Sequence, residues 1–250
     1  MRLRCAVSQT RDAATVTDPS NLLRVMPAEG GMRVTRAIVL AGGDPVAPNL
    51  KQYVPAHADV VAADSGLHLA ATLGLTVACI VGDLDSADPA AVEAAVAAGA
   101  TVERHPVAKD ATDLELAIEA ARARGATAVT VFGGAGGRMD HFVANLAVLA
   151  APGLAPVVID AYMGDARIAV GRGGEPAVTI AGPAGALVSL VPAGGDACGI
   201  TTAGLEYPLN GEDLPQGTSR GVSNVVVAPP ATVRLEHGTL LVIEPQGAAA

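Results

Sequence analysis

The chain has 250 residues and a formal net charge of −9 at pH 7, and 50% of its residues are hydrophobic. This length can bury a sizeable core, as one large domain or two small ones. The acidic balance argues against a nucleic-acid partner, which would require a basic stripe. No apolar run is long enough for a membrane-spanning helix, so we expect no membrane partner.

Residues 1–32 show no periodicity and lack the apolar stretch that marks a secretory signal. We predict a poorly ordered N-terminal extension there, because Met32 directly precedes the first apolar strand. The cysteines Cys5, Cys79 and Cys198 are too far apart for a zinc pattern and fit a reducing compartment. The predicted location is therefore cytoplasmic, and Cys79, inside an apolar strand, is expected to be a core residue.

Residues 33–163 alternate short apolar strands with helical segments. The helical spacing is clearest in the apolar series Leu114, Ala117, Ile118 and Ala121. Strands that alternate with helices form βαβ units, so we predict a mostly parallel, Rossmann-like α/β domain. The predicted strands are 37–41, 60–63, 77–81, 101–104, 128–132 and 156–161.

Residues 164–250 have a different pattern, with short β-rich runs separated by Gly, Pro and Asn turns. We predict a second domain here, a small β-sandwich or barrel joined to the first near residues 162–170. His237-Gly238 is expected to form a tight hairpin turn, because apolar residues alternate on both sides of it. The predicted strands are 177–180, 187–191, 222–227, 232–236 and 240–243.

The most informative segment is Gly82-Asp83-Leu84-Asp85-Ser86, which follows an apolar strand. A buried strand cannot carry unpaired carboxylates, so Asp83 and Asp85 must lie past its C-terminal end, where open α/β sheets bind ligands. Hard oxygen ligands at this spacing suit Mg²⁺ together with substrate phosphates. The alternative is a helix-capping role, but Asp88-Pro89 already supplies the start signal of the next helix.

Two further clusters follow later strands. The first is Lys109-Asp110-Ala111-Thr112-Asp113, where Thr112 has the capping-box spacing to Glu115 and is expected to cap the next helix. Asp110 and Asp113 are then candidate ligands, or acids that interact favourably with the positive end of the helix dipole. The run 133–137 is rich in glycine between a strand and a helix and can offer backbone N–H groups to phosphate oxygens. Arg138 adds a forked donor, and Asp140 can address the metal or a substrate.

The ordered set of clusters resembles the thiamine pyrophosphokinase family over about residues 36–244. The matching segments are Asp64-Ser65-Gly66, Gly82-Asp83-Leu84-Asp85-Ser86, Lys109-Asp110 with Thr112-Asp113, Gly136-Gly137-Arg138 with Asp140-His141 and Asn145, Gly204-Leu205-Glu206-Tyr207-Pro208-Leu209, and Gly217-Thr218-Ser219-Arg220-Gly221-Val222-Ser223-Asn224.

The resemblance implies an N-terminal α/β catalytic domain that binds nucleotide and Mg²⁺, followed by a β-sandwich that binds thiamine and forms a homodimer with active sites between subunits. It implies transfer of the diphosphate of ATP to the hydroxyethyl group of thiamine, giving thiamine diphosphate and AMP.

Residue roles follow from the same resemblance. The implied Mg²⁺ ligands are Asp83, Asp85, Asp110 and Asp113. The implied catalytic residues are Asp83, Asp85, Asp113, Arg138 and Asp140. The implied nucleotide contacts are Asp64, Lys109, Asp110, Gly136, Gly137 and Arg138. The implied thiamine contacts are Ser219, Ser223 and Asn224. The chain has no Trp, so any platform under the thiamine rings must be aliphatic or a tyrosine.

Three alternatives stay open. A phosphatase of the haloacid dehalogenase type would use an aspartate of Asp83-Leu84-Asp85-Ser86 as nucleophile, but leaves the cluster around Arg138 unexplained. A pyrophosphokinase of the same fold could act on another alcohol, such as a hydroxymethylpterin. A binding module without catalysis would not need the full set of charged clusters.

Overall fold

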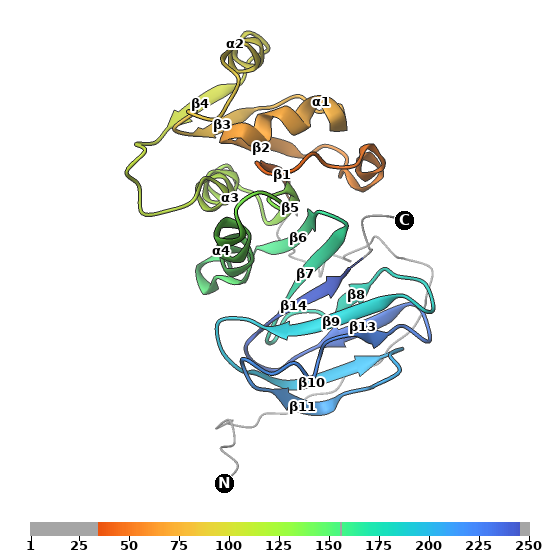
Figure 1. Ribbon diagram of the computed structural model, residues 1–250. Helices are drawn as coiled ribbons and strands as arrows, with labels where there is room; N and C mark the ends of the chain where they lie inside the picture. The colour runs from red at the N-terminus through yellow and green to blue at the C-terminus, as the bar shows by residue number, and fades with distance from the viewer. Residues whose placement is uncertain (1–34, 156, 246–250) are drawn as a thin grey trace, which may run out of the picture. The chain divides into compact units, whose positions relative to one another are not determined.

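The computed structural model describes residues 35–155 and 157–245, which belong to one compact unit, so the predicted extension at 1–32 lies outside the described part. A ten-stranded sheet has the order β12-β9-β14-β7-β6-β5-β1-β2-β3-β4, and a four-stranded antiparallel sheet has the order β11-β10-β13-β8 (Figure 1). The fold is therefore mixed α/β with a separate antiparallel sheet. Within the described residues, no helix is long and apolar enough to cross a bilayer.

One half of the large sheet is parallel, as the alternation of strands and helices predicts. β1 lies between β2 and β5, so the strand order reverses direction there; such a switch point is where open α/β sheets bind ligands. The parallel strands are β1 (Arg36–Ala41), β2 (Asp59–Ala63), β3 (Cys79–Gly82), β4 (Thr101–Arg104), β5 (Ala128–Gly133) and β6 (Val158–Met163).

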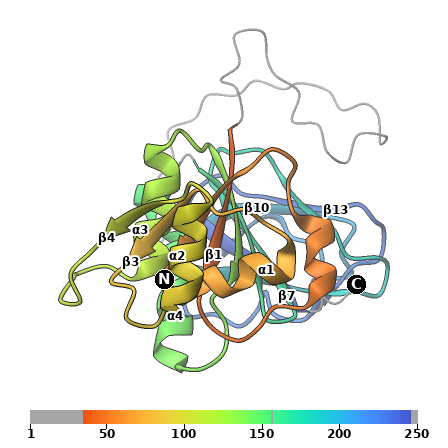
Figure 2. The same ribbon diagram turned by 90° about the horizontal axis from the view of Figure 1, so that it is seen from above.

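Alternate residues of β1 enter two apolar clusters, one on each face of the sheet. Val39 shares a cluster with Ile118, and Leu40 shares the other with Leu73. Cys79 is completely buried in the first cluster, which confirms its predicted core position. Helices lie on both sides of the parallel strands (Figure 2). They are α1 (Leu69–Leu73), α2 (Pro89–Ala97), α3 (Asp113–Ala123), α4 (Met139–Ala150), and the 3-10 helices η1 (Pro48–Tyr53), η2 (Asp64–His68) and η3 (Pro152–Leu154).

The two predicted helix caps are confirmed. The Asp88 side chain accepts a hydrogen bond from the backbone N–H of Ala90, with Pro89 in the first helical position of α2. The Thr112 hydroxyl accepts a hydrogen bond of 3.3 Å from the backbone N–H of Glu115 at the start of α3. The Thr112 hydroxyl is thus used as a cap, whereas the neighbouring Asp113 side chain contacts Lys109.

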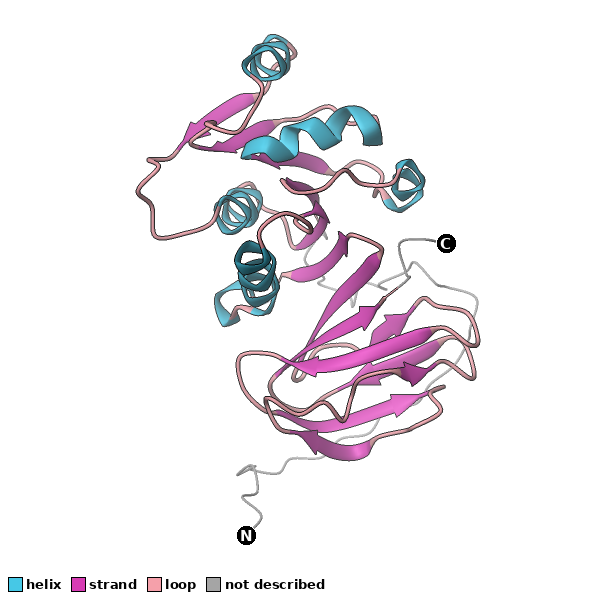
Figure 3. Cartoon of the chain, in the orientation of Figure 1, coloured by secondary structure: helices cyan, strands magenta, loops and turns pink. Residues whose placement is uncertain are grey.

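The rest of the described chain is built from antiparallel strands and loops (Figure 3). A third apolar cluster joins the end of the large sheet to the small sheet, and contains Ile180, Leu190, Ile200 and Val242. The large sheet continues through β7 (Ala166–Arg172), β14 (Thr239–Glu244), β9 (Leu187–Pro192) and β12 (Asn224–Val225). The small sheet contains β8 (Val178–Ile180), β10 (Ala197–Ala203), β11 (Asn210–Leu214) and β13 (Ala231–Arg234).

The structure corrects one prediction in this half. Near the expected junction at residues 162–170, Met163 pairs with Ala166 and β7 extends the large sheet from β6. His237-Gly238 is not a hairpin turn, because β13 and β14 belong to different sheets. Gly238 has a φ of +87°, and a Cβ on it would lie 2.2 Å from the Asp196 carbonyl oxygen, so this glycine serves a close crossing between sheets. The division into domains at residues 163 and 164 stays a prediction.

Three strands, β7, β10 and β11, were not predicted. In β10 a register shift interrupts the alternation, and Gly199 within it has a φ of +65°. β11 has the sequence Asn-Gly-Glu-Asp-Leu, which contains a single apolar residue. No local apolar period marks β10 and β11, which form through pairing with neighbouring strands. β7 does contain the buried apolar residues Ile168, Ala169 and Val170.

Candidate active site

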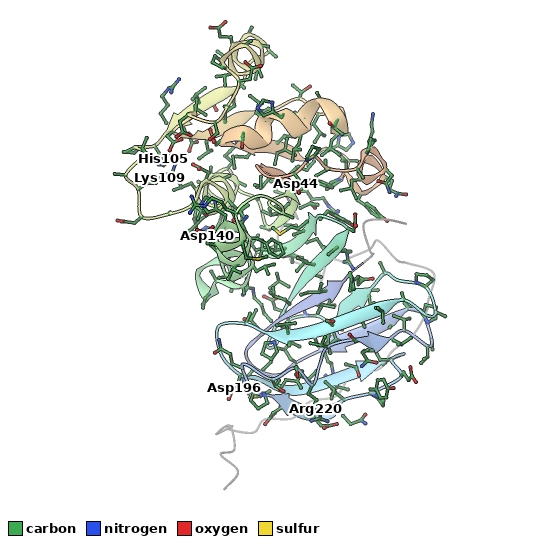
Figure 4. All side chains as sticks on the ribbon, in the orientation of Figure 1. Asp44, His105, Lys109, Asp140, Asp196 and Arg220 are labelled. Atoms are coloured by element: carbon green, nitrogen blue, oxygen red, sulfur yellow. The ribbon has the colours of Figure 1, made fainter. Side chains whose placement is uncertain are left out.

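The loops that follow β1, β2, β3 and β5 meet at the switch point and line a pocket of about 750 Å³ together with the segment before α3. Lys109 and Asp140 lie at this end of the molecule, whereas Asp196 and Arg220 lie on the antiparallel part (Figure 4). The lining residues are 41–43, 63–65, 83, 85–86, 107, 109–114, 134, 136–138, 141 and 145.

Three carboxylates converge in this pocket. Asp64, Asp83 and Asp85 each offer an oxygen, and these oxygens lie within 4.8 Å of one another. Asp64 directly follows β2 and is 7% exposed, and its Oδ1 has no hydrogen-bond partner. Gly82 allows this approach, because a Cβ there would lie 3.0 Å from Asp113 Oδ1 and 3.1 Å from Asp64 Cβ. An unpartnered, buried carboxylate oxygen beside two more carboxylates fits a hard divalent cation.

Lys109 reaches into the same group of carboxylates from the loop before α3. Its Nζ lies 3.0 Å from Asp83 Oδ2 and 2.6 Å from Asp113 Oδ1. Burial disfavours the ammonium, but the hydrogen bonds to Asp113 and Asp83 outweigh it and raise the pKa of Lys109. Lys109 is therefore a charged, nearly buried cation within an acidic pocket, and its side chain is only 13% exposed.

The acidic groups differ in their electrostatic surroundings. Burial raises the pKa of Asp64, and the neighbouring carboxylates add to the shift although a backbone hydrogen bond from Ser65 opposes it. The hydrogen bond from Lys109 lowers the pKa of Asp83. Asp83 Oδ1 also accepts a hydrogen bond of 3.3 Å from the backbone N–H of Asp85. The charge of Asp83 is thus favoured, whereas a cation beside Asp64 would offset the burial that disfavours its charge.

The glycine-rich loop after β5 is held against the loop after β1. Gly134 donates its N–H to the Gly42 carbonyl at 2.9 Å, and Asp44 donates its N–H to the Ala135 carbonyl at 2.8 Å. Asn145 of α4 donates its side-chain amide to the Gly134 carbonyl at 2.9 Å. Four glycines, at the end of β5 and in this loop, have φ between +64° and +91°, a region that other residues rarely adopt. The four are Gly133, Gly134, Gly136 and Gly137.

Arg138 and Asp140 form an exposed ion pair at the start of α4. Their closest atoms, Arg138 Nη2 and Asp140 Oδ2, are 2.5 Å apart, and the side chains are 70% and 64% exposed. The hydrogen bond from Arg138 lowers the pKa of Asp140 to about 2. Arg138 lines the pocket, whereas Asp140 does not line it and instead accepts a hydrogen bond from Arg138. Because the pair is open to solvent, its guanidinium can turn toward an anion in the pocket.

The predicted thiamine contacts lie elsewhere. Ser219, Ser223 and Asn224 are not among the described residues that line the pocket. Asn224 is buried, and its side chain is bonded to the backbone of Tyr207, accepting from its N–H at 3.1 Å and donating to its carbonyl at 2.8 Å. Ser223 has a φ of +61° and donates its N–H to the Ser189 hydroxyl. Asn224 therefore fixes the position of the Tyr207 backbone.

The sequence predicted Asp83, Asp85, Asp110 and Asp113 as metal ligands and Asp64 as a nucleotide contact. In the structure, the carboxylates of Asp64, Asp83 and Asp85 lie close together, and Asp113 forms an ion pair with Lys109. The signal for Asp64 was present, since it directly follows β2, and Asp83 directly follows the parallel neighbour β3. Asp110 lines the same pocket beside Asp113.

Comparison with known proteins identifies the family. One family model, the catalytic domain of thiamin pyrophosphokinase, matches residues 50–157, and a second, its vitamin B1 binding domain, matches residues 178–240. Together the two models cover more than half of the chain. The chain belongs to the thiamine pyrophosphokinase family. The predicted membership of this family is therefore confirmed, and the pocket lies within or beside the region of the catalytic model.

Individual members of the family agree with this assignment. A curated thiamine pyrophosphokinase from Bacillus subtilis (strain 168) is 26% identical over 206 residues, covering 82% of this chain and 96% of the relative. A crystal structure of thiamine pyrophosphokinase from Bacillus subtilis is 27% identical, covers 84% of this chain and 98% of its own, and has a TM-score of 0.71. The enzyme from Candida albicans, 14% identical, has the same TM-score over 84% and 89% of the chains and shows the common fold.

Proposed function

We propose that this protein is a thiamine diphosphokinase that transfers the diphosphate of ATP to the hydroxyethyl group of thiamine, with Mg²⁺ as cofactor and AMP as second product. The observation that carries the proposal is the pocket at the switch point, where carboxylates, a lysine and a glycine-rich loop converge in a member of this family. In finer terms the fold is a Rossmann-like α/β domain followed by a β-sandwich, and the protein is proposed to be cytoplasmic.

The carboxylate cluster is the proposed metal site. Asp83 and Asp85 would hold Mg²⁺ with Asp64, and Asp113 and Asp110 would complete the acidic wall of the pocket. Bound Mg²⁺ supplies charge stabilisation for the phosphate oxygens during transfer. The buried Asp64 Oδ1, which has no protein donor, supports its assignment as a ligand.

The basic and glycine-rich elements are the proposed phosphate site. The backbone of Gly136 and Gly137 lies beside the start of α4, where N–H groups and the helix dipole favour anions. Lys109 and Arg138 would bind the remaining phosphate charge, and Asp140 would orient Arg138. The thiamine hydroxyl oxygen would form a bond to the β-phosphorus while the bond from this phosphorus to the bridging oxygen breaks, and that oxygen would leave with AMP. The hydroxyl proton would pass to solvent or to an aspartate of the cluster. Such a transfer depends on positioning and electrostatics more than on covalent participation by the protein.

The aromatic residues point to a platform for thiamine. The chain has three Tyr, two Phe and no Trp. Tyr162 stacks between Tyr53 and Phe132, with ring centroids 4.6 and 5.3 Å apart, and Phe142 packs against the core. Tyr207 is 64% exposed, so it is the aromatic residue left to stack on the cationic thiazolium ring.

The acceptor site would therefore lie on the antiparallel part of the chain. Ser219, Ser223 and Asn224 are the proposed thiamine contacts beside Tyr207, with Asn224 acting as a positioning residue. None of the described residues from the vitamin B1 binding region lines the pocket. This separation supports a homodimer in which the acceptor site of one subunit serves the pocket of the other.

Replacing Tyr207 by Ala is expected to raise the KM for thiamine about tenfold, because a cation–π contact contributes about 1–2 kcal/mol. Tyr207→Phe keeps the ring and should stay within about twofold of the wild type. Steady-state kinetics at saturating Mg-ATP measure both. A KM unchanged in Tyr207→Ala would remove Tyr207 from the acceptor site.

Mixing Tyr207→Ala chains with Asp83→Asn chains should restore activity if the sites lie between subunits.

The decisive experiment incubates the protein with thiamine and Mg-ATP and detects AMP and thiamine diphosphate together in equal amounts. Phosphate release without thiamine diphosphate would favour the haloacid-dehalogenase-type phosphatase. AMP formation with a hydroxymethylpterin in place of thiamine would favour a pyrophosphokinase for another alcohol. Omission of Mg²⁺ should abolish product formation.

A further inference from the structure

Lys109 occupies an unusual place for a phosphate-binding residue, because its ammonium already forms ion pairs with two carboxylates. Its Nζ contacts Asp83 and Asp113 at hydrogen-bond distance, and its side chain is almost buried. Among the described residues, Asp83 and Asp113 have no other ion-pair partner. Arg138, the other strong cation that lines the pocket, is paired with Asp140.

The oxygen atoms of Asp83 show what this contact means for a metal ion. Oδ2 accepts from Lys109 at 3.0 Å and Oδ1 accepts from the backbone N–H of Asp85 at 3.3 Å. A cation that binds Asp83 must therefore share or displace a hydrogen bond that this carboxylate now accepts, whereas Asp64 Oδ1 has no donor. Such a cation would also lie close to the positive charge of Lys109, and like charges a few ångströms apart repel by about 1–4 kcal/mol near a protein surface.

A lysine at position 109, in place of an arginine, suits a positive charge that changes partners. The chain has two lysines, Lys51 and Lys109, and 14 arginines. Lysine carries a compact charge on a flexible stem, whereas a guanidinium binds carboxylates in a rigid fork. A lysine can exchange carboxylate oxygens for phosphate oxygens with a small rotation of its stem. The triphosphate of ATP would offer such oxygens in the same pocket.

We infer that Lys109 acts as an internal counter-ion that keeps the divalent-cation affinity of the nucleotide-free protein low, and that nucleotide binding raises this affinity by drawing Lys109 onto the phosphates. The inference rests on the metal and nucleotide sites of the proposed function. It makes cation binding conditional on nucleotide, so metal and phosphates bind cooperatively. By linkage, the cation must raise nucleotide affinity by the same factor.

The test uses Mn²⁺ as the probe and measures its binding to the nucleotide-free protein by electron paramagnetic resonance. Lys109→Met removes the charge and keeps the length of the stem, so Mn²⁺ should bind at least about fivefold more tightly than to the wild type. Lys109→Arg keeps the charge and should stay as weak as the wild type. Lys51→Met, the matched control on the other lysine, should change nothing.

A second measurement follows the cooperativity. Calorimetry with α,β-methylene ATP should show a large gain in nucleotide affinity on adding Mn²⁺ to the wild type, and a smaller gain in Lys109→Met. Circular dichroism confirms that each variant is folded, and Lys109→Gln replaces Lys109→Met if that variant does not fold. Unchanged or weaker Mn²⁺ binding in the uncharged variants would overturn the inference. Both measurements are made without thiamine. A protein that lacks thiamine diphosphokinase activity can therefore still support or overturn the inference about Lys109.

Discussion

Replacing Asp83 by Asn is expected to lower the turnover of thiamine diphosphate synthesis by about two to four orders of magnitude. The substitution keeps the shape of the side chain and removes the negative charge that faces the proposed cation and Lys109. Loss of a metal-based stabilisation of several kcal/mol corresponds to this range, because about 1.4 kcal/mol equals a factor of ten. Asp85→Asn is expected to act in the same direction, since its carboxylate belongs to the same cluster.

The matched control is Glu119→Gln, which also neutralises a carboxylate but on the exposed side of α3. Its activity and melting temperature should equal those of the wild type, because its ion pair with Arg122 is exposed to solvent. Activities are compared over a titration of Mg²⁺ with a fixed excess of ATP and thiamine. Near-normal turnover of folded Asp83→Asn, with an unchanged Mg²⁺ requirement, would disprove the metal assignment.

The second large effect is expected in stability. Arg167 on β7 lies between two carboxylates of neighbouring strands, 2.7 Å from Asp160 of β6 and 2.6 Å from Glu244 of β14. Glu244 also accepts a hydrogen bond of 2.7 Å from the backbone N–H of Gly182, and its side chain is only 3% exposed. Burial disfavours the guanidinium charge, but the carboxylates outweigh it and raise the pKa of Arg167. This group joins the parallel and antiparallel halves of the large sheet.

Arg167→Met should lower the free energy of unfolding by about 3–5 kcal/mol, because it leaves Glu244 as a buried carboxylate without its cation. Urea denaturation followed by circular dichroism measures the change. Arg122→Met, which breaks an exposed ion pair, should cost less than about 1 kcal/mol. Equal losses in the two variants would show that the buried group contributes no more than a surface pair.

Local signals in the sequence were sufficient for the elements whose cause is local. Asp88 and Thr112 cap their helices through backbone groups two and three residues away, so their pattern is readable from the chain alone. The six parallel strands were predicted within about two residues. Most of them are buried on both faces and form apolar runs in the sequence, whereas β4, at the edge of the sheet, is largely exposed. The position of Asp83 and Asp85 follows from the same rule, since an unpaired carboxylate cannot lie inside a buried strand. Asp160 lies inside β6, but it is paired with Arg167.

Long-range pairing decided the rest. The strand order places the loop after β2 beside the loop after β3, which brings Asp64 to Asp83, and no local period records that order. The contact of Lys109 with Asp83 joins residues 26 positions apart. The strands β10 and β11 and the crossing at Gly238 likewise depend on partners distant in sequence. The sequence by itself determined the elements and the chemical types at their ends. Only the tertiary structure decided which ends meet, because that depends on burial of apolar faces between segments far apart in the chain.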